Sequence, residues 1–327
     1  MSRSVTYKPV VALLAALMLA LQCGCSHKDI LCPGNEPRTL TIRFMWDHAP
    51  KAEPAGMTAY FFPLSEGTRM WRFDIAGRDG GMVELPPGEY RFLAVNNDLP
   101  GVLFGGQDSF DTFSARARGA GASGVLGSTG MLYGCTVERV EVTICGINYI
   151  TQEGMVKECR KGLLRCSPDS LSTVYNVILR QCTGLDKVKS VTGLLHGVAP
   201  ELLVAEDMAQ GAPQALAVNM NMPASGSTST GTTLTGAAAG FGAPAGREPA
   251  FTLEVRATRH DGKVITKSFD VTSQVINSIN PKNVFIILEG IDFPDAAEPP
   301  GPDDDVGIEV GVDGWHVIEI EFDTSLP

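Results

Sequence analysis

The sequence lacks the short motifs that identify most enzymes. Its 327 residues contain no GxxxxGK[ST] phosphate loop, no HExxH zinc motif and no GxSxG nucleophile elbow. The five histidines are scattered, and no two cysteines have the CxxC spacing of a structural zinc site. Residues 119–124 match GxGxxG, but they lie in a glycine-rich stretch without the strand and helix that a dinucleotide site needs. These absences predict a protein that is not an enzyme and holds no cofactor or metal.

Basic residues are also scarce. Lysine and arginine number 26 against 37 aspartates and glutamates, which gives a formal charge of −11. Because nucleic acids attract basic surfaces, this balance argues against a nucleic-acid partner, and acidic solubility explains it. The 44% of hydrophobic residues is enough to build packed cores, and the length suggests two domains.

The apolar run near the N-terminus is too short to cross a bilayer. Val10 to Leu21 is twelve residues long and follows Arg3 and Lys8, as the apolar core of an export signal does. The run leads into Gln22-Cys23-Gly24-Cys25, which resembles a bacterial lipoprotein signal because a small residue precedes Cys25. We therefore predict a signal peptide over residues 1–24, lipidation at Cys25 and attachment to a membrane through the lipid. Plain secretion with cleavage nearby is the alternative.

Six further cysteines follow Cys25 and could form disulfides in an exported protein: Cys32, Cys135, Cys145, Cys159, Cys166 and Cys182. Cys135 and Cys145 flank a single alternating run, and such a strand separates them by roughly 33 Å, which excludes that pair. Cys159 and Cys166 enclose Gly162, where the chain could fold back, so they are a candidate disulfide. Buried free thiols are an equally good alternative.

Alternation of apolar and polar residues dominates the chain and predicts an all-β fold. Between Gly80 and Pro100, two alternating runs are separated by Pro87-Gly88, which suits a type II turn. Because a tight hairpin uses other turn types, these two strands are expected to lie in different sheets.

The predicted domains follow from this pattern. A tether covers residues 25–38, a first sandwich covers 39–150, a second covers 151–293, and a linker with a last strand covers 294–327. Gly105 to Gly134 should be a long loop, with a helical turn or two between Asp108 and Ala117. Residues 221–246 are of low complexity and should form a disordered surface loop. A short helix is expected from Thr272 to Asn280.

The last predicted strand stands alone behind a linker rich in proline, glycine and aspartate. It runs from Trp315 to Phe322 and must pair with some sheet edge. It either closes the sheet of its own domain or is added to a neighbouring molecule. The candidate donor residues are Trp315, Val317, Ile318, Ile320 and Phe322.

The chain resembles a known family through a series of short segments: the lipoprotein cysteine with His27 to Cys32, then Phe44 to Asp47, Gly56 to Pro63, Ala76 to Gly81, Leu85 to Tyr90 and Ala94 to Asp98. It is similar to the fimbrillin-like (Mfa-like) outer-membrane lipoproteins of anaerobic Gram-negative bacteria, and within them to a domain-of-unknown-function subgroup. The resemblance implies two tandem transthyretin-like (immunoglobulin-like) β-sandwiches. It also implies a surface-exposed place on the outer membrane and a role as fimbrial subunit, tip or anchor. Polymers of this family grow by donor-strand exchange.

One departure from the family narrows the role. Polymerising subunits need a first strand that a protease can remove, and the chain shows no convincing cleavage site, although Arg38 sits just before the first predicted strand. A non-enzymatic anchor or accessory subunit therefore fits better than a shaft subunit. The alternative is a surface lipoprotein that binds glycans or another ligand on exposed Trp46, Trp71 and Tyr133. Their alternation, however, favours packing in a core.

Overall fold

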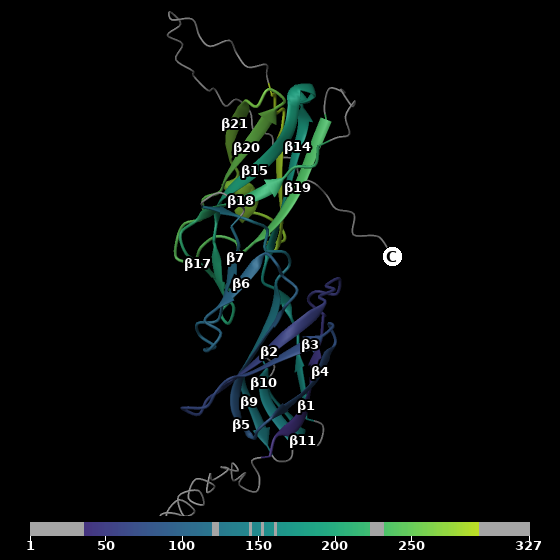
Figure 1. Cartoon of the computed structure of the whole chain (residues 1–327), viewed down its shortest axis with the longest axis vertical. Helices are drawn as coiled ribbons and strands as arrows, with labels where there is room; N and C mark the ends of the chain where they lie inside the picture. The colour runs from purple at the N-terminus through teal and green to yellow at the C-terminus, as the bar shows by residue number, and fades with distance from the viewer. Residues whose placement is uncertain are drawn as a thin grey trace, which may run out of the picture.

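The protein is an elongated molecule made almost entirely of β-strands. The computed structural model describes residues 36–119, 124–143, 146–151, 154–159, 162–222 and 232–293. In Figure 1 a first β-sandwich lies below a second one, with a small sheet between them. Within the described ranges, the α-helix is the five-residue α2 (Thr272–Ile276), shorter than the predicted helix, and Leu185–Lys187 forms a 3-10 turn. The prediction of an all-β fold with two sandwiches is confirmed.

The first sandwich consists of a three-stranded and a seven-stranded sheet. The smaller sheet has the order β12 (Leu163–Cys166), β1 (Arg38–Phe44), β4 (Gly80–Leu85). The larger has the order β11 (Gly154–Cys159), β10 (Gly146–Thr151), β9 (Tyr133–Thr143), β5 (Gly88–Asn96), β2 (Gly56–Pro63), β3 (Trp71–Ala76), and β13 (Asp169–Ser170) also pairs with β9. Side chains of alternate residues meet between the two sheets and form one core, which includes Leu40, Ile42, Phe44, Phe61 and Phe92.

The turn at Pro86-Pro87 separates the two sheets as the sequence predicts. β4 ends at Leu85 in the smaller sheet, and β5 begins at Gly88 in the larger one. Proline has no N–H for the ladder, so neither strand can continue through this point. Leu85 and Phe92 are both fully buried, and they hold the two sheets together on either side of the turn.

The second sandwich has a three-stranded and a five-stranded sheet. The first has the order β19 (Thr232–Gly240), β14 (Thr173–Cys182), β22 (Asn283–Glu289). The other has the order β21 (Val264–Asp270), β20 (Thr252–Arg259), β15 (Val188–Val198), β18 (Gln214–Asn219), β8 (Val125–Leu126). Its core is mainly aliphatic, with Val177, Leu195, Leu216, Leu253 and Ile286 fully buried.

A third core joins the two sandwiches. A four-stranded sheet with the order β17 (Met208–Gln210), β16 (Glu201–Leu203), β7 (Ser114–Ala117), β6 (Val102–Gly105) lies between them (Figure 1). The core contains Tyr60, Phe62, Phe110, Phe113, Leu132, Leu202 and Phe241, and we call this cluster the aromatic junction. Because β2 and β5 contribute from the first sandwich and Phe241 follows β19 of the second, the junction fixes one sandwich against the other.

In its described parts, residues 105–119 and 124–134, the stretch from Gly105 to Gly134 is not a long loop, and the prediction of one is wrong for them. It supplies β7 and β8, and its Phe113 and Leu132 are completely buried in the aromatic junction. Ser114 to Ala117 is a strand rather than part of a helical turn. A few apolar side chains in a glycine-rich stretch were enough to order it, because the neighbouring strands supply the hydrogen-bond partners.

The low-complexity stretch also contains a strand, so the prediction of disorder is wrong for residues 232–246. β19 pairs with β14 along its length, and Leu234 and Ala238 are buried. Gly236 and Gly240 allow close packing, since a Cβ atom would lie 2.5 Å from the Asn219 carbonyl oxygen at the first and 2.9 Å from Val198 at the second. Residues 223–231 lie outside the described residues.

The strands from Gly146 to Ser170 belong to the first sandwich by their pairing. β10 pairs with β9, β12 pairs with β1, and β13 returns to β9. The boundary expected between residues 150 and 151 therefore falls inside a sheet of the first sandwich. We propose a boundary near Leu171, which lies between β13 and β14, the first strand of the second sandwich.

Candidate functional site

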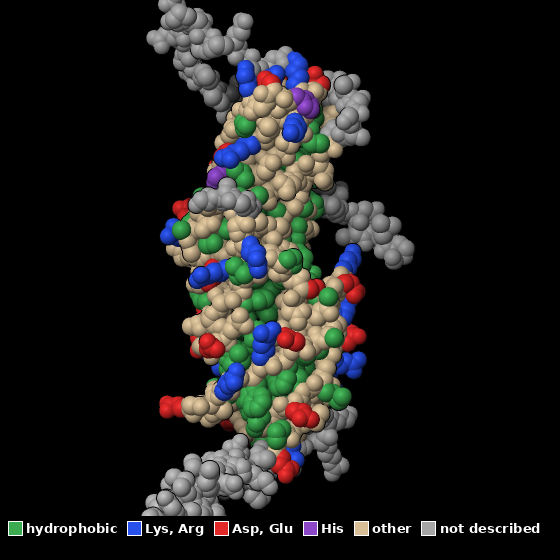
Figure 2. Space-filling view, viewed as in Figure 1, with side chains coloured by type: hydrophobic (Ala, Val, Ile, Leu, Met, Phe, Trp, Pro, Cys, Tyr) green, Lys and Arg blue, Asp and Glu red, His purple; other side chains and the backbone are tan. Residues whose placement is uncertain are grey.

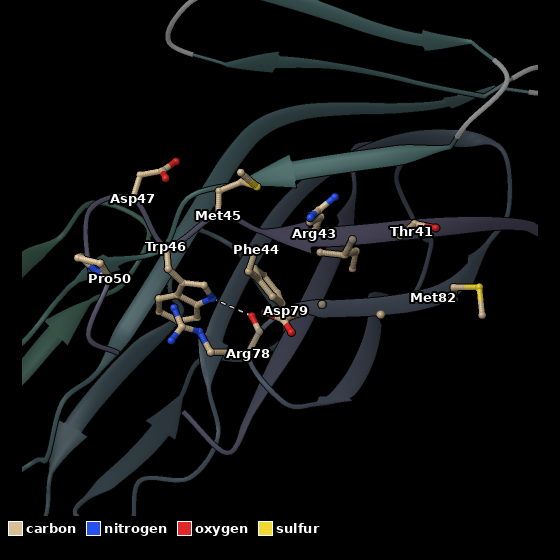
Figure 3. Close-up of a pocket in the computed structure, with 13 residues that line it drawn as sticks. Thr41, Arg43, Phe44, Met45, Trp46, Asp47, Pro50, Arg78, Asp79 and Met82 are labelled. Carbon is tan, nitrogen blue, oxygen red and sulfur yellow. Dashed lines mark hydrogen bonds between the residues drawn. The ribbon is translucent and has the colours of Figure 1, made fainter. Parts of the chain in front are cut away.

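A groove of about 670 Å³ lies on the outer face of the three-stranded sheet of the first sandwich (Figure 3). Thr41 and Arg43 project into it from β1, on the face opposite the buried side chains of that strand. Met82 of β4 stands opposite Thr41 and is 77% exposed. The floor is bare at Gly80, because its φ of 115° and the Ile42 carbonyl oxygen leave no room for a side chain.

The end of the groove is held rigid by Trp46. The indole Nε1 donates a hydrogen bond to the Arg78 carbonyl oxygen at 2.8 Å, and the Arg78 guanidinium lies over the ring at 5.2 Å. Glu53 pairs with that guanidinium at 2.6 Å. The ring of Tyr133 meets Trp46 edge-on with centroids 5.5 Å apart. Trp46 is only 8% exposed, so these aromatic rings stabilise the core and do not form a binding surface.

The exposed aromatic platform that a glycan-binding surface would need is therefore not assembled. Trp46 is buried and Tyr133 is half-buried, whereas Trp71 is 36% exposed on the outermost strand β3 and stacks on Phe73. Core packing was the alternative explanation for these three residues, and it holds for Trp46 and Tyr133.

The side chains along the groove are mainly charged or apolar. Those that line it include Arg43, Asp47, Arg78 and Asp79 but neither a cysteine nor a histidine. His48 does not pair with its neighbour Asp47, because its Nδ1 lies 2.8 Å from the carboxylate of Asp169, where both groups are exposed. No cluster of three or more His, Cys, Asp or Glu that could hold a metal occurs in the described residues.

The outermost strands matter more for an assembly protein, since an unpaired edge can accept another strand. On β22 that edge is closed by a side chain. Gln274 of α2 accepts a hydrogen bond from the Ile287 N–H at 2.8 Å and donates one to the Ile287 carbonyl oxygen at 3.2 Å. The amide therefore takes the two hydrogen bonds that a neighbouring strand would make at this residue.

Two further edges are capped in a similar way. On β19, Ser128 Oγ accepts from the Ala239 N–H at 3.0 Å, and the Thr129 N–H donates to the Ala239 carbonyl oxygen at 3.0 Å. On β12, the Arg165 N–H donates to the Tyr149 hydroxyl at 3.3 Å. Nothing in the sequence pattern marked Gln274, Ser128 or Tyr149 as caps, because a cap is recognised only when its strand is in place.

In the part of the chain that the structure describes, the other outermost strands are β3, β4, β6, β8, β11, β17 and β21. On β3, Arg72 and Asp74 form an exposed ion pair at 3.1 Å. β21 alternates between exposed and half-buried residues and carries Lys267. Charged side chains on an edge strand discourage unspecific pairing between molecules. The face in Figure 2 likewise shows basic and acidic side chains interspersed.

Most of the site residues predicted from the sequence lie outside the described residues, namely Cys25, Trp315, Val317, Ile318, Ile320 and Phe322. Cys159 ends β11, but its side chain is also outside them. Cys166 is buried with a free thiol, and so is Cys182. The lipidation site, the donor strand and the Cys159–Cys166 pairing stay predictions. In the described residues, no helix is both long and apolar enough to pass through a membrane.

Comparisons with known proteins found a matching family model, a similar curated protein and solved structures with the same fold. The model of the family described as Domain of unknown function (DUF5119) matches residues 24–219, which is more than half of the chain. A predicted fimbrium anchoring subunit of Bacteroides ovatus, Fim4B, is 28% identical over 132 residues. That match covers 40% of this chain and 38% of the relative, so it spans less than half of the relative's length.

Two solved structures share the architecture. A predicted adhesin of Bacteroides ovatus superposes with a TM-score of 0.61 and 19% identity, covering 84% of this chain and 99% of the other. A predicted polysaccharide-binding protein of Bacteroides thetaiotaomicron superposes with a TM-score of 0.50 and 11% identity, covering 77% of this chain and 91% of the other. At such identities the likeness concerns the fold alone.

Proposed function

We propose that this chain, which belongs to the family described as Domain of unknown function (DUF5119), is a non-enzymatic, lipid-anchored subunit that anchors or accompanies fimbriae at the cell surface. The observation that carries the proposal is the sequence similarity to a predicted fimbrium anchoring subunit. The geometry supports it, because the described residues form two β-sandwiches with several capped sheet edges.

The place of β1 supports an anchor or accessory role over a shaft role. β1 is the central strand of its sheet, paired with β4 on one side and β12 on the other. Arg38 is the first residue of β1 rather than a residue before it. A protease that cuts after Arg38 would therefore leave nearly all of β1 in the sheet, and no groove for a donor strand would open.

Attachment to the outer membrane through Cys25 is the first part of the proposal to test. The variant Cys25→Ser should lose incorporation of labelled palmitate and leave the membrane fraction, because no acyl chain remains to partition into the bilayer. Cys23→Ser is the matched control, and it should keep both properties. Loss of labelling in Cys23→Ser but not in Cys25→Ser would show that Cys23 carries the lipid. The absence of labelling in the wild type would refute the lipid anchor.

Binding of fimbrial subunits through the predicted C-terminal strand is the second part. Deletion of residues 315–327 should abolish co-purification of fimbrial subunits with the membrane-bound protein and release fimbriae into the medium. The double variant Ile318→Asp with Ile320→Asp should do the same, because it places charge on the apolar face of the strand. Glu319→Gln with Glu321→Gln changes the opposite face and serves as the control. Unchanged co-purification after the deletion would contradict strand addition.

A surface binding protein for glycans or another ligand is the second candidate. The groove over β1 and β4 is the observation that favours it, since Arg43, Asp47 and Met82 surround a bare floor. Arg43→Ala with Met82→Ala should then weaken binding on a glycan array at least tenfold while the fold is kept. Absence of any glycan that binds the wild type would remove this candidate.

A further inference from the structure

The first sandwich contains two cysteines on facing sheets. Cys166 ends β12 of the three-stranded sheet and Cys135 lies near the start of β9 in the seven-stranded one. Both belong to the same hydrophobic core, Cys166 as a buried member and Cys135 as a half-buried side chain packed against it. Both thiols are free in the structure.

The strand register explains why they meet. After β12 the chain crosses to the other sheet as β13, where Asp169 pairs with Gly134 and Ser170 with Tyr133. Cys135 follows Gly134 directly, and Cys166 comes three residues before Asp169. The crossing therefore starts at Cys166 and ends beside Cys135. Burial, and after it a hydrogen bond with the Cys135 thiol, raise the pKa of the Cys166 thiol well above its ordinary value.

Cys159 is placed less well than Cys135 to form a disulfide with Cys166. Its backbone pairs with Gly146, which pairs in turn with Thr143 at the far end of β9. Eight residues of strand separate Thr143 from Cys135, which corresponds to about 26 Å along β9. A disulfide needs Cα atoms within roughly 7 Å, so the backbone favours Cys135 over Cys159 as the partner of Cys166.

We propose that Cys135 and Cys166 form a disulfide bond that links the two sheets of the first sandwich once the exported chain meets a protein or small-molecule disulfide. The exposed part of Cys135 makes it the thiol that an oxidant reaches. Its thiolate attacks one sulfur of the incoming disulfide, the other sulfur leaves as a thiolate, and a mixed disulfide with Cys135 forms. Cys166 loses its proton and displaces the second thiolate, so two cysteines are oxidised and one external disulfide is reduced to two thiols. The bond then lies in the core, shielded from reductants.

The proposal of a disulfide rests on the proposed function only in that the chain is taken to lie outside the cytoplasm. The bond is therefore tested on purified protein, where the cellular location plays no part. Purified protein comprising residues 25–327 is refolded with oxidised glutathione, alkylated without reduction and digested with trypsin. Trypsin cleaves at Arg139, Lys157, Arg160 and Arg165, which places Cys135, Cys145, Cys159 and Cys166 on four different peptides. We expect the peptide that contains Cys135 to be linked to the peptide that starts at Cys166. A link from Cys166 to any other cysteine, or free thiols at both positions, overturns the proposal.

A stability measurement gives a second readout. Reduction of the oxidised wild type should lower the thermal midpoint by roughly 5–10 °C, because the link closes a loop of about 30 residues in the unfolded chain. Cys135→Ser should abolish this redox dependence, whereas Cys182→Ala in the second sandwich should keep it. A redox shift that persists in Cys135→Ser would contradict the proposed link. Fractionation of cells tests the surface location separately, since a mislocalised protein could still form the bond in the refolding experiment.

Discussion

The first and the last described strand occupy different positions in the sheets of the two sandwiches. In the first, the earliest described strand β1 occupies the centre of a three-stranded sheet, with Leu40, Ile42 and Phe44 buried beneath it. In the second, the last described strand β22 lies at the edge of its sheet and pairs in parallel with β14 on one side. The other side of β22 is met by the side chain of Gln274 at Ile287.

This difference indicates where strand addition can occur. A central strand such as β1 cannot leave without breaking two ladders and exposing the core of the first sandwich. An edge strand such as β22 needs only the displacement of one side chain to pair with an added strand. The edge of β22 is therefore a candidate place for strand addition in the second sandwich, whereas in the first such a place is offered by outermost strands such as β3 and not by β1. The aromatic junction holds the two sandwiches in a fixed position relative to each other.

The largest effect should come from breaking the junction. Phe113 is completely buried and meets Tyr60 edge-on at 4.8 Å. We expect Phe113→Ala to lower the free energy of unfolding by about 3–5 kcal/mol, because a large cavity remains. Calorimetry should then resolve two transitions, one for each sandwich. Leu103→Ala, at an exposed position of β6, is the control, and an unchanged single transition in Phe113→Ala would show that the junction does not couple the sandwiches.

A cavity under β1 should affect the first sandwich alone. Ile42 is buried, so Ile42→Ala should cost about 2–5 kcal/mol, whereas Thr41→Ala on the outer face should cost little. The fluorescence of Trp46 and Trp71, measured with Trp315→Phe in the background, reports this sandwich. A loss of stability in Thr41→Ala as large as in Ile42→Ala would contradict the assignment of the two faces.

Opening the edge of β22 should have a smaller effect on stability but a visible one on association. Gln274→Ala removes two hydrogen bonds, which together contribute about 1–2 kcal/mol. Sedimentation should show concentration-dependent self-association, because Ile287 can then pair with another strand. Ser273→Ala, one residue earlier in α2, should remain monomeric. A monomeric Gln274→Ala protein would mean that the helix rather than the amide protects this edge.

The smallest effect concerns pH. Burial alone would raise the pKa of Glu201, but hydrogen bonds from Arg116 and Ser114 outweigh it and hold the pKa below its ordinary value of 4.5. Because the folded pKa is lowered, the carboxylate stabilises β16 against β7 above pH 4.5, and this contribution is lost as the pH falls through the folded pKa. Arg116→Met should therefore flatten the stability profile below pH 4.5. An identical profile in wild type and variant would exclude this contribution.

Much of the fold could be predicted where large apolar residues alternate. Leu40, Ile42 and Phe44 of β1 face the core as their spacing predicts, because a half-buried strand repeats every two residues. Leu253 and Val255 of β20 follow the same rule. The separation of β4 and β5 into two sheets was also predictable, since Pro86 and Pro87 end one ladder before the next begins.

The sequence by itself determined the all-β class and the inward face of each strand that alternates, because burial of one face is a local property of the pattern. Only the tertiary structure decided what the two glycine-rich stretches do. The Thr129 N–H from one of them donates a hydrogen bond to the Ala239 carbonyl oxygen of the other, so one stretch caps the edge of the strand that the other forms. Glycine, alanine and serine side chains carry too little apolar area to show a period, and their order comes from the backbone groups that neighbouring strands present.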